Sequence, residues 1–338
     1  MMTVADSAVD STADKVPLRR WFAVVAVALG TFSMVTSEQL PVGLLTSVSG
    51  ALGVSPGTAG LMVTVPGLVA SATAPILPVA IGRLDRRVVL LGLIALMAAA
   101  NVLAAFAPNF GLLLAARFLV GIAIGGFWAL AAGIAVRMVP AKYVPQATAI
   151  AFGGATAANV LGIPAGTLIG ELTDWRIAFG LLGGLGLLVV VALLWLLPRM
   201  PATEPVRLRT LGEQFRNPVV RAGVLVTFLM VSGHFAAFTF VSLILQSVSG
   251  IDKSMVGPAL LAFGAAGIVG NFVTGVAAGR NVRTALITIS TLIAAVLALF
   301  ALIGGIIADS AVLSAVLWFG AGLSVLAALV VSTTRTAR

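Results

Sequence analysis

Apolar segments of about 20 residues recur along the chain from residue 21 to residue 332, and each is long enough to cross a bilayer as a helix. Lipid offers no hydrogen bonds, so a spanning segment must satisfy its own backbone groups, as a helix does. Only 9% of the 338 residues are charged, against about 25% in a typical soluble domain. The sequence therefore predicts an all-α polytopic membrane protein.

Hydropathy predicts ten transmembrane helices, near residues 21–46, 57–81, 88–106, 111–137, 145–170, 177–197, 219–247, 255–278, 284–304 and 311–332. Lysine and arginine favour cytoplasmic segments and so set the orientation. With a cytoplasmic N-terminus, every Lys and Arg lies on the cytoplasmic side except Arg117, Arg176 and Lys253. The net charge of +9 is then a topology signal and an attraction to anionic lipid, not a nucleic-acid surface. We expect a multi-pass protein of the inner or plasma membrane with both termini cytoplasmic.

A long polar stretch separates six predicted spans from four. We predict a disordered cytoplasmic tail at 1–17, a six-helix bundle at 18–197, a cytoplasmic linker at 198–218, a shorter bundle at 219–332 and a tail at 333–338. The halves share a pattern, Gly-Arg-x-x-Arg, at residues 82–86 and again 197 residues later at 279–283. The span endings GTLIGE (166–171) and GGIIAD (304–309) match at an offset of only 138. We infer that the second half lacks about 59 residues, the counterparts of span four and most of span five.

Residues 82–87, GRLDRR, follow the second predicted span. They resemble a shortened copy of the loop motif Gly-x-x-x-Asp-Arg-x-Gly-Arg-Arg of the major facilitator superfamily, which Gly82, Asp85, Arg86 and Arg87 fit. Glycine permits a tight turn, and Asp85 can cap the next helix or bind an arginine. The resemblance implies a cytoplasmic gating motif; ordinary topology charges are the alternative.

Two spans carry small residues at intervals of four, which favours close helix packing. In span four, ARFLVGIAIGGFW resembles the superfamily's arginine motif, with Gly121 and Gly125 after Arg117. Arg117 lies about 9 Å from the outer end, where it faces a polar partner or snorkels to the interface. Span five resembles the Gly-Pro-rich motif of drug/proton antiporters through Gly162, Pro164, Gly166 and Gly170, though simple packing explains its glycines equally well.

Glu38 stands in the apolar run 22–48, where a carboxylate is costly and therefore marks function. In the superfamily fold spans one and four border the cavity, so Arg117 can reach Glu38, and Pro41 can loosen the helix beside it. His234 is the repeat-equivalent of Glu38, at an offset of 196. We interpret Glu38, Arg117 and His234 as proton-coupling candidates; a carboxylate held by hydrogen bonds in the bundle is the alternative. Candidates for the substrate cavity are Gln39, Trp128, Asn159, His234 and Asn271.

TSEQLPVGLLTSV, GGFWAL, DWR (174–176) and GHFAAFTF (233–240) together resemble the drug/proton antiporters, in the branch of arabinose-type sugar efflux permeases and purine nucleoside efflux pumps. The resemblance implies a major-facilitator-like pair of helix bundles, here with about ten helices (six plus four) instead of the usual twelve. It also implies a secondary active transporter, with proton-coupled efflux of a small polar solute (nucleoside, sugar or drug) by alternating access.

The sequence carries no motif typical of an enzyme or of a metal-binding protein. The sequence has no phosphate-binding loop, no His-Glu-x-x-His and no Gly-x-Ser-x-Gly, so we expect no enzyme. With no cysteine and one histidine, we expect no metal and no cofactor. The expected partners are a small-molecule substrate, protons and membrane lipid, with no nucleic acid, and the expected state is a monomer. A shortened, transport-inactive or engineered scaffold is one alternative; a uniporter or importer is another.

Overall fold

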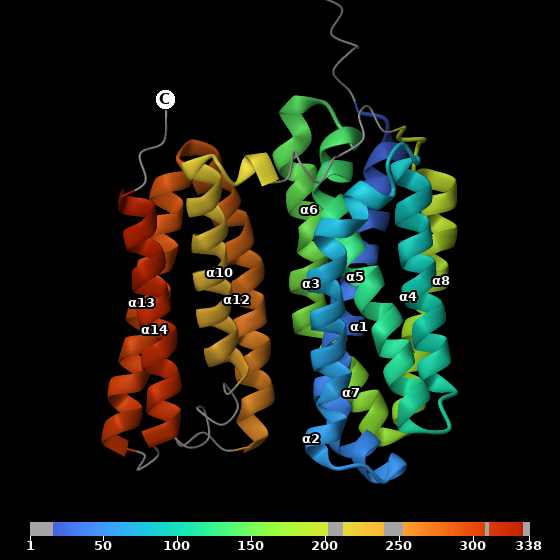
Figure 1. Ribbon diagram of the computed structural model, residues 1–338, viewed down its shortest axis with the longest axis horizontal. Helices are drawn as coiled ribbons and strands as arrows, with labels where there is room; N and C mark the ends of the chain where they lie inside the picture. The colour runs from blue at the N-terminus through green and yellow to red at the C-terminus, as the bar shows by residue number, and fades with distance from the viewer. Residues whose placement is uncertain (1–15, 202–211, 240–252, 308–310, 334–338) are drawn as a thin grey trace, which may run out of the picture. The chain divides into compact units, whose positions relative to one another are not determined.

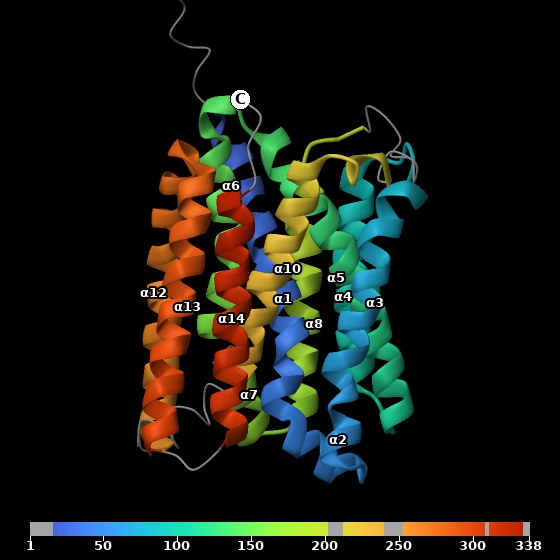
Figure 2. The ribbon, with the colours of Figure 1, turned by 60° about the vertical axis from the view of Figure 1, so that its left-hand side comes forward.

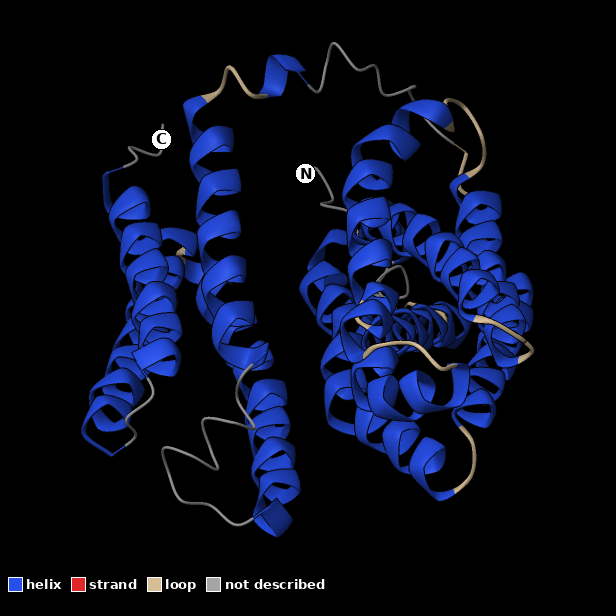
Figure 3. Ribbon diagram, turned by 60° about the horizontal axis from the view of Figure 1, so that its bottom comes forward, coloured by secondary structure: helices blue, strands red, loops and turns tan. Residues whose placement is uncertain are grey.

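The computed structural model describes residues 16–201, 212–239, 253–307 and 311–333 (Figure 1). These residues form helices and connecting loops, and no strand occurs among them (Figure 3). The prediction of an all-α protein is thus confirmed. The chain divides into two compact units, residues 1–203 and 204–338.

The first unit holds the six predicted N-terminal spans. Its helices are α1 (Leu18–Leu52), α2 (Pro56–Ala59), α3 (Leu61–Ala80), α4 (Arg86–Ala105), α5 (Phe110–Met138), the 3₁₀ turn η2 (Ala141–Tyr143), α6 (Val144–Ala157), the π-helical turn η3 (Ala158–Gly162), α7 (Ile163–Leu172) and α8 (Trp175–Leu196). The fifth predicted span is therefore interrupted: α6, η3 and α7 together run beside α1 (Figures 1 and 2).

The second unit contains α10 (Pro218–Thr239), α12 (Lys253–Arg280), α13 (Val282–Ile307) and α14 (Ala311–Thr333). Helix α14 packs against α13 and α10, whereas α12 packs mainly against α13. The Arg283 guanidinium donates to the Ser332 carbonyl at the end of α14. In the first unit Arg87, at the start of α4, makes the same kind of bond to Leu194 at the end of α8.

Seven helices among the described residues are long and apolar enough to cross a membrane. They include all six N-terminal spans and Val282–Leu299 of α13. The other three predicted spans coincide with shorter apolar stretches of α10, α12 and α14. A multi-pass membrane protein follows directly, while the count of ten spans stays a prediction.

Polar caps define where several helices begin. Asp85, Asn109 and Asp174 each accept a backbone N–H of the first turn that follows, which satisfies a donor without a helical partner. Gly53 ends α1 in the left-handed conformation with φ of 62°, where a side chain would be strained. These signals divide the apolar sequence into separate spans.

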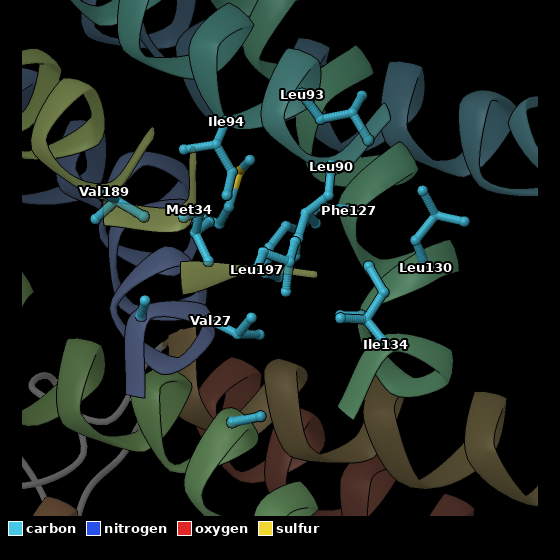
Figure 4. Close-up of a cluster of buried hydrophobic side chains, with 14 of the residues drawn as sticks. Val27, Met34, Leu90, Leu93, Ile94, Phe127, Leu130, Ile134, Val189 and Leu197 are labelled. Atoms are coloured by element: carbon cyan, nitrogen blue, oxygen red, sulfur yellow. The ribbon is translucent and has the colours of Figure 1, made fainter. Parts of the chain in front are cut away.

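The core of the first unit lies between α1, α4, α5 and α8. Buried side chains from these helices, among them Met34, Ile94, Phe127 and Val189, meet in one cluster (Figure 4). A second cluster lies further along the same helices and includes Leu40, Leu113 and Phe179. Arg117 and Asn101, which are fully buried, stand among these apolar residues.

Glycines let neighbouring backbones approach. A Cβ on Gly125 would lie 2.5 Å from the Ala70 carbonyl oxygen of α3, and one on Gly121 would lie 2.7 Å from that of Pro66. On the fifth span, a Cβ at Gly154, Gly162, Gly166 or Gly170 would overlap Ala28, Thr36, Leu40 or Leu44 of α1, in that order. The glycine stripe of span five therefore fits against successive turns of α1.

Candidate functional site

The first helix carries Glu38 at a half-buried position. Around it the helix is polar, since Thr36 and Ser37 are buried and Gln39 is half-buried. No hydrogen bond to the Glu38 carboxylate occurs among the contacts of the described residues. The alternative of a carboxylate held by hydrogen bonds thus finds no support in the part of the chain that the structure describes.

Arg117 of α5 is fully buried, with 0% of its surface exposed. Its Nη2 donates to the Ser37 carbonyl oxygen at 2.6 Å, and its guanidinium carbon lies 5.6 Å from the centre of the Phe179 ring. Its Nε and Nη1 have no hydrogen-bond partner among the residues that the structure describes. The snorkelling alternative is therefore wrong, because the side chain points into the bundle. Buried donors of this kind are costly unless a water or an anion meets them.

Arg117 and Glu38 are each other's electrostatic neighbours, yet they do not form an ion pair in the described part of the chain. The guanidinium is instead bonded one residue before Glu38, at Ser37. The arrangement leaves one cation and one carboxylate close together but separate.

Asn101 of α4 is a third polar residue of the site, which sequence reasoning missed. It is fully buried and its Nδ2 donates to Ser37 Oγ at 2.8 Å and to the Met97 carbonyl at 2.8 Å. Ser37 Oγ can in turn donate to Asn101 Oδ1 at 3.2 Å. An asparagine in the apolar run AAANVLAA was the available signal, since polar residues within spans join helices.

The predicted cavity residues lie on several helices of both units. Trp128 is half-buried and stacks on Phe152 of α6, with ring centres 5.7 Å apart and planes at 26°. Asn159 is exposed on η3, the π-helical turn. Asn271 is half-buried on α12, in the other unit. His234 lies on α10, and its side chain falls outside what the structure describes. Within the first unit, Glu38, Gln39 and Arg117 lie around one stretch of α1.

The interruption of span five has a local cause. Pro164 lacks the N–H that a regular helix would direct to the preceding turn, and the π-helical turn Ala158–Gly162 lies just before it. Such turns are frequent at functional sites. Gly162, at the end of the turn, faces the Thr36 side chain of α1, two residues from Glu38.

The GRLDRR loop binds the segment that leaves α8. Gly82 adopts a φ of 48°, which favours glycine. Asp85 Oδ1 accepts the Arg87 N–H at 2.9 Å and the Met200 N–H at 2.9 Å, and the Arg86 N–H donates to the Met200 carbonyl at 3.0 Å. The loop therefore caps α4 and fastens residues 197–201 to its own bundle.

Replacing Asp85 with alanine should destabilise the protein by about 2–3 kcal/mol, because a cap and a charged hydrogen bond are lost together. Asp174→Ala is the matched control, since Asp174 caps α8 through the Arg176 N–H and bonds to no distant segment among the described residues. The Asp174→Ala substitution should lower the free energy of unfolding by about 1 kcal/mol. Thermal unfolding of the purified protein in detergent measures both. Equal losses would contradict the role of Asp85 in holding residue 200.

The sequence matches the family description Major Facilitator Superfamily over residues 27–337. It is 34% identical over 306 residues to the purine ribonucleoside efflux pump NepI of Salmonella paratyphi B, covering 90% of this chain and 77% of that protein. The same pump from Salmonella typhimurium is 35% identical over 274 residues, covering 81% and 69%.

Solved structures share the fold. The human organic anion transporter MFSD10 (TETRAN) superposes with a TM-score of 0.62 at 16% identity, covering 93% of this chain and 87% of that one. An inward-facing, unoccupied bacterial homologue of the human lysosomal transporter Spinster gives a TM-score of 0.58 at 20% identity, covering 93% and 74%. Family match, sequence identity and fold agree: the chain belongs to the major facilitator superfamily.

Proposed function

We propose that the protein is a secondary exporter of the cell membrane that releases a purine nucleoside or a similar small polar solute in exchange for protons. Both termini would lie in the cytoplasm, as the lysine and arginine distribution indicates. The observation that carries the proposal is the buried Arg117, whose Nε and Nη1 have no hydrogen-bond partner among the described residues, in electrostatic contact with the carboxylate of Glu38. Charged groups within spans are expensive and are kept where they act on a solute or a proton.

The pair offers a simple coupling device. An ionised Glu38 would attract Arg117 away from the Ser37 carbonyl, whereas a protonated Glu38 would leave Arg117 where the structure has it. Proton binding would thus change how α5 is held to α1. Because α1 also packs along span five through glycines, a shift of α1 would reach the π-helical turn at Ala158–Gly162. In alternating access such a shift would favour one orientation of the cavity.

The substrate class rests on the relatives, which are named purine ribonucleoside efflux pumps. Two features of this chain are compatible with a nucleoside. Gln39 offers a donor and an acceptor next to Glu38, and the half-buried Trp128 offers an aromatic ring for a base. A sugar or a drug remains the alternative within the same class of small polar solutes.

The second unit favours another candidate, a scaffold that does not transport. Helix α14 packs on α13 and α10 as α8 packs on α4 and α1, which supports α14 as the counterpart of α8. In the first unit α3 packs extensively on α5, but α12, the counterpart of α3, packs mainly on α13. This arrangement is expected if the counterpart of span four is missing. Without that span one wall of the cavity would be incomplete.

Solute exchange in proteoliposomes decides between the two candidates. Vesicles containing the 338-residue protein are loaded with unlabelled inosine, and uptake of labelled inosine, adenosine, arabinose and chloramphenicol is followed. An exporter should exchange at least one nucleoside well above protein-free vesicles. Absence of exchange for all four, by protein shown to be folded, would favour the scaffold. A version with the missing two spans restored is then the informative comparison.

A further inference from the structure

The residue at position 41 explains why the Ser37 carbonyl can bind Arg117. In a regular α-helix the carbonyl of residue i accepts the N–H of residue i+4, so Ser37 would be bonded to residue 41. Residue 41 is proline, inside α1, and proline has no N–H. The oxygen left without a helical donor is the one that Arg117 Nη2 reaches at 2.6 Å.

We propose that Pro41 is a positioning residue, which creates the backbone acceptor that docks Arg117 next to Glu38. The effect of Pro41 on transport rests on the proposed coupling function, whereas the contact between Arg117 and the Ser37 carbonyl does not. Ser37 is the sole hydrogen-bond partner of Arg117 within the described residues, because Nε and Nη1 have none. A fully buried guanidinium gains more from such a bond than an exposed one, since no water replaces it.

The Ser37 residue that provides the acceptor is also held by a hydrogen bond to α4. Ser37 is fully buried, and its hydroxyl is bonded to Asn101 of α4. One residue of α1 thus ties α4 through its side chain and α5 through its carbonyl. Pro41 frees that carbonyl, Asn101 fixes its position, and Arg117 occupies it. The carboxylate of Glu38 follows on the next residue, which keeps Arg117 within its electrostatic reach.

Other prolines show that the pairing is not a general effect of proline in this bundle. Helix α3 contains Pro66, Pro75 and Pro78. Pro75 frees the carbonyl of Ser71, yet no side-chain donor meets that oxygen among the described contacts, and both residues are exposed. Pro75 is therefore the matched control: the same loss of an N–H, with no arginine on the freed carbonyl.

The test is a double-mutant cycle on thermal unfolding of the purified full chain in detergent. Pro41→Ala returns an N–H to the Ser37 carbonyl, which must then be shared with Arg117. We expect its effect on the unfolding temperature to differ by about 3 °C or more between the native background and Arg117→Met. Pro75→Ala should have the same effect in both backgrounds. Additive effects of Pro41→Ala and Arg117→Met would overturn the proposal.

Two further outcomes are informative. If Pro41→Ala alone is not recovered folded, recovery in the Arg117→Met background supports the proposal and continued loss contradicts it. In proteoliposomes, Pro41→Ala should lower gradient-driven inosine transport about tenfold while exchange at equal pH changes less than threefold, and Pro75→Ala should change neither. Equal losses in both transport assays would overturn the positioning role. The unfolding cycle needs no transport, so it separates failure of this proposal from failure of the proposed function.

Discussion

Glu38→Gln should abolish inosine transport driven by a pH gradient, with at least a hundredfold loss, while exchange of inosine at equal pH persists. Glutamine keeps the size and hydrogen-bonding capacity of the carboxyl group but can neither bind nor release a proton. Because Arg117 then faces no ionisable partner, it should stay on the Ser37 carbonyl in every state. The measurement is labelled-inosine transport into vesicles with and without an imposed gradient.

Glu213→Gln is the control for this substitution, since Glu213 is exposed and lies outside the six N-terminal spans. It should leave both gradient-driven transport and exchange unchanged. Undiminished gradient-driven transport by Glu38→Gln would exclude Glu38 as the coupling group. Loss of exchange together with coupling would instead assign Glu38 to solute binding.

Gly154→Ala should be the most destabilising single-methyl substitution of the first unit, costing about 3 kcal/mol or more. A Cβ at Gly154 would overlap the backbone carbonyl of Ala28 in α1, and a second backbone atom, the Phe32 nitrogen, lies 3.1 Å away. Backbone cannot move aside as a side chain can, so α6 and α1 must separate. Thermal unfolding of purified protein in detergent measures the loss.

Gly153→Ala is the matched control on the adjacent position of the same helix. A Cβ at Gly153 meets no atom within 4 Å, and alanine is the better helix former by about 1 kcal/mol. Its stability should therefore be unchanged or slightly raised. If the two variants unfold at the same temperature, close packing of α6 on α1 through Gly154 is wrong.

Much of the fold could be predicted because the bilayer imposes it. Long apolar runs must be helices, and the six N-terminal spans follow hydropathy closely. The break in the fifth span could not be predicted in the same way. Hydropathy is continuous through Ala158–Gly162, and whether Pro164 kinks, bulges or ends a helix depends on what packs beside it.

Parts of the candidate site could be predicted from the sequence. Glu38 and Arg117 were recognisable because charge inside a span is costly. Their relation was not, since the sequence suggested that Arg117 could reach Glu38 directly, whereas the structure bonds it to the Ser37 carbonyl. A backbone acceptor leaves no mark in composition or spacing. The sequence predicts that Pro41 loosens α1. The structure adds that Pro41 leaves the Ser37 carbonyl without a helical donor, and this carbonyl is the one that Arg117 binds.

The GRLDRR loop illustrates another limit. Sequence reasoning gave Asp85 a choice of an arginine or a helix cap, and the structure adds a partner, the Met200 N–H, that lies 115 residues away. Contacts between remote segments depend on how α8 ends, which local patterns do not record. A gating role for this loop stays a prediction; its structural role in the first unit is visible.

Proton movement during solute release tests the account most directly. Vesicles loaded with inosine and a pH-sensitive dye, with equal pH on both sides and the membrane potential clamped, are diluted into inosine-free buffer. Exchange of solute for protons predicts that the lumen acidifies as inosine leaves, and that Glu38→Gln abolishes the acidification. Inosine release without any pH change would show uniport, and alkalinisation would show symport; either result would contradict the proposed mechanism.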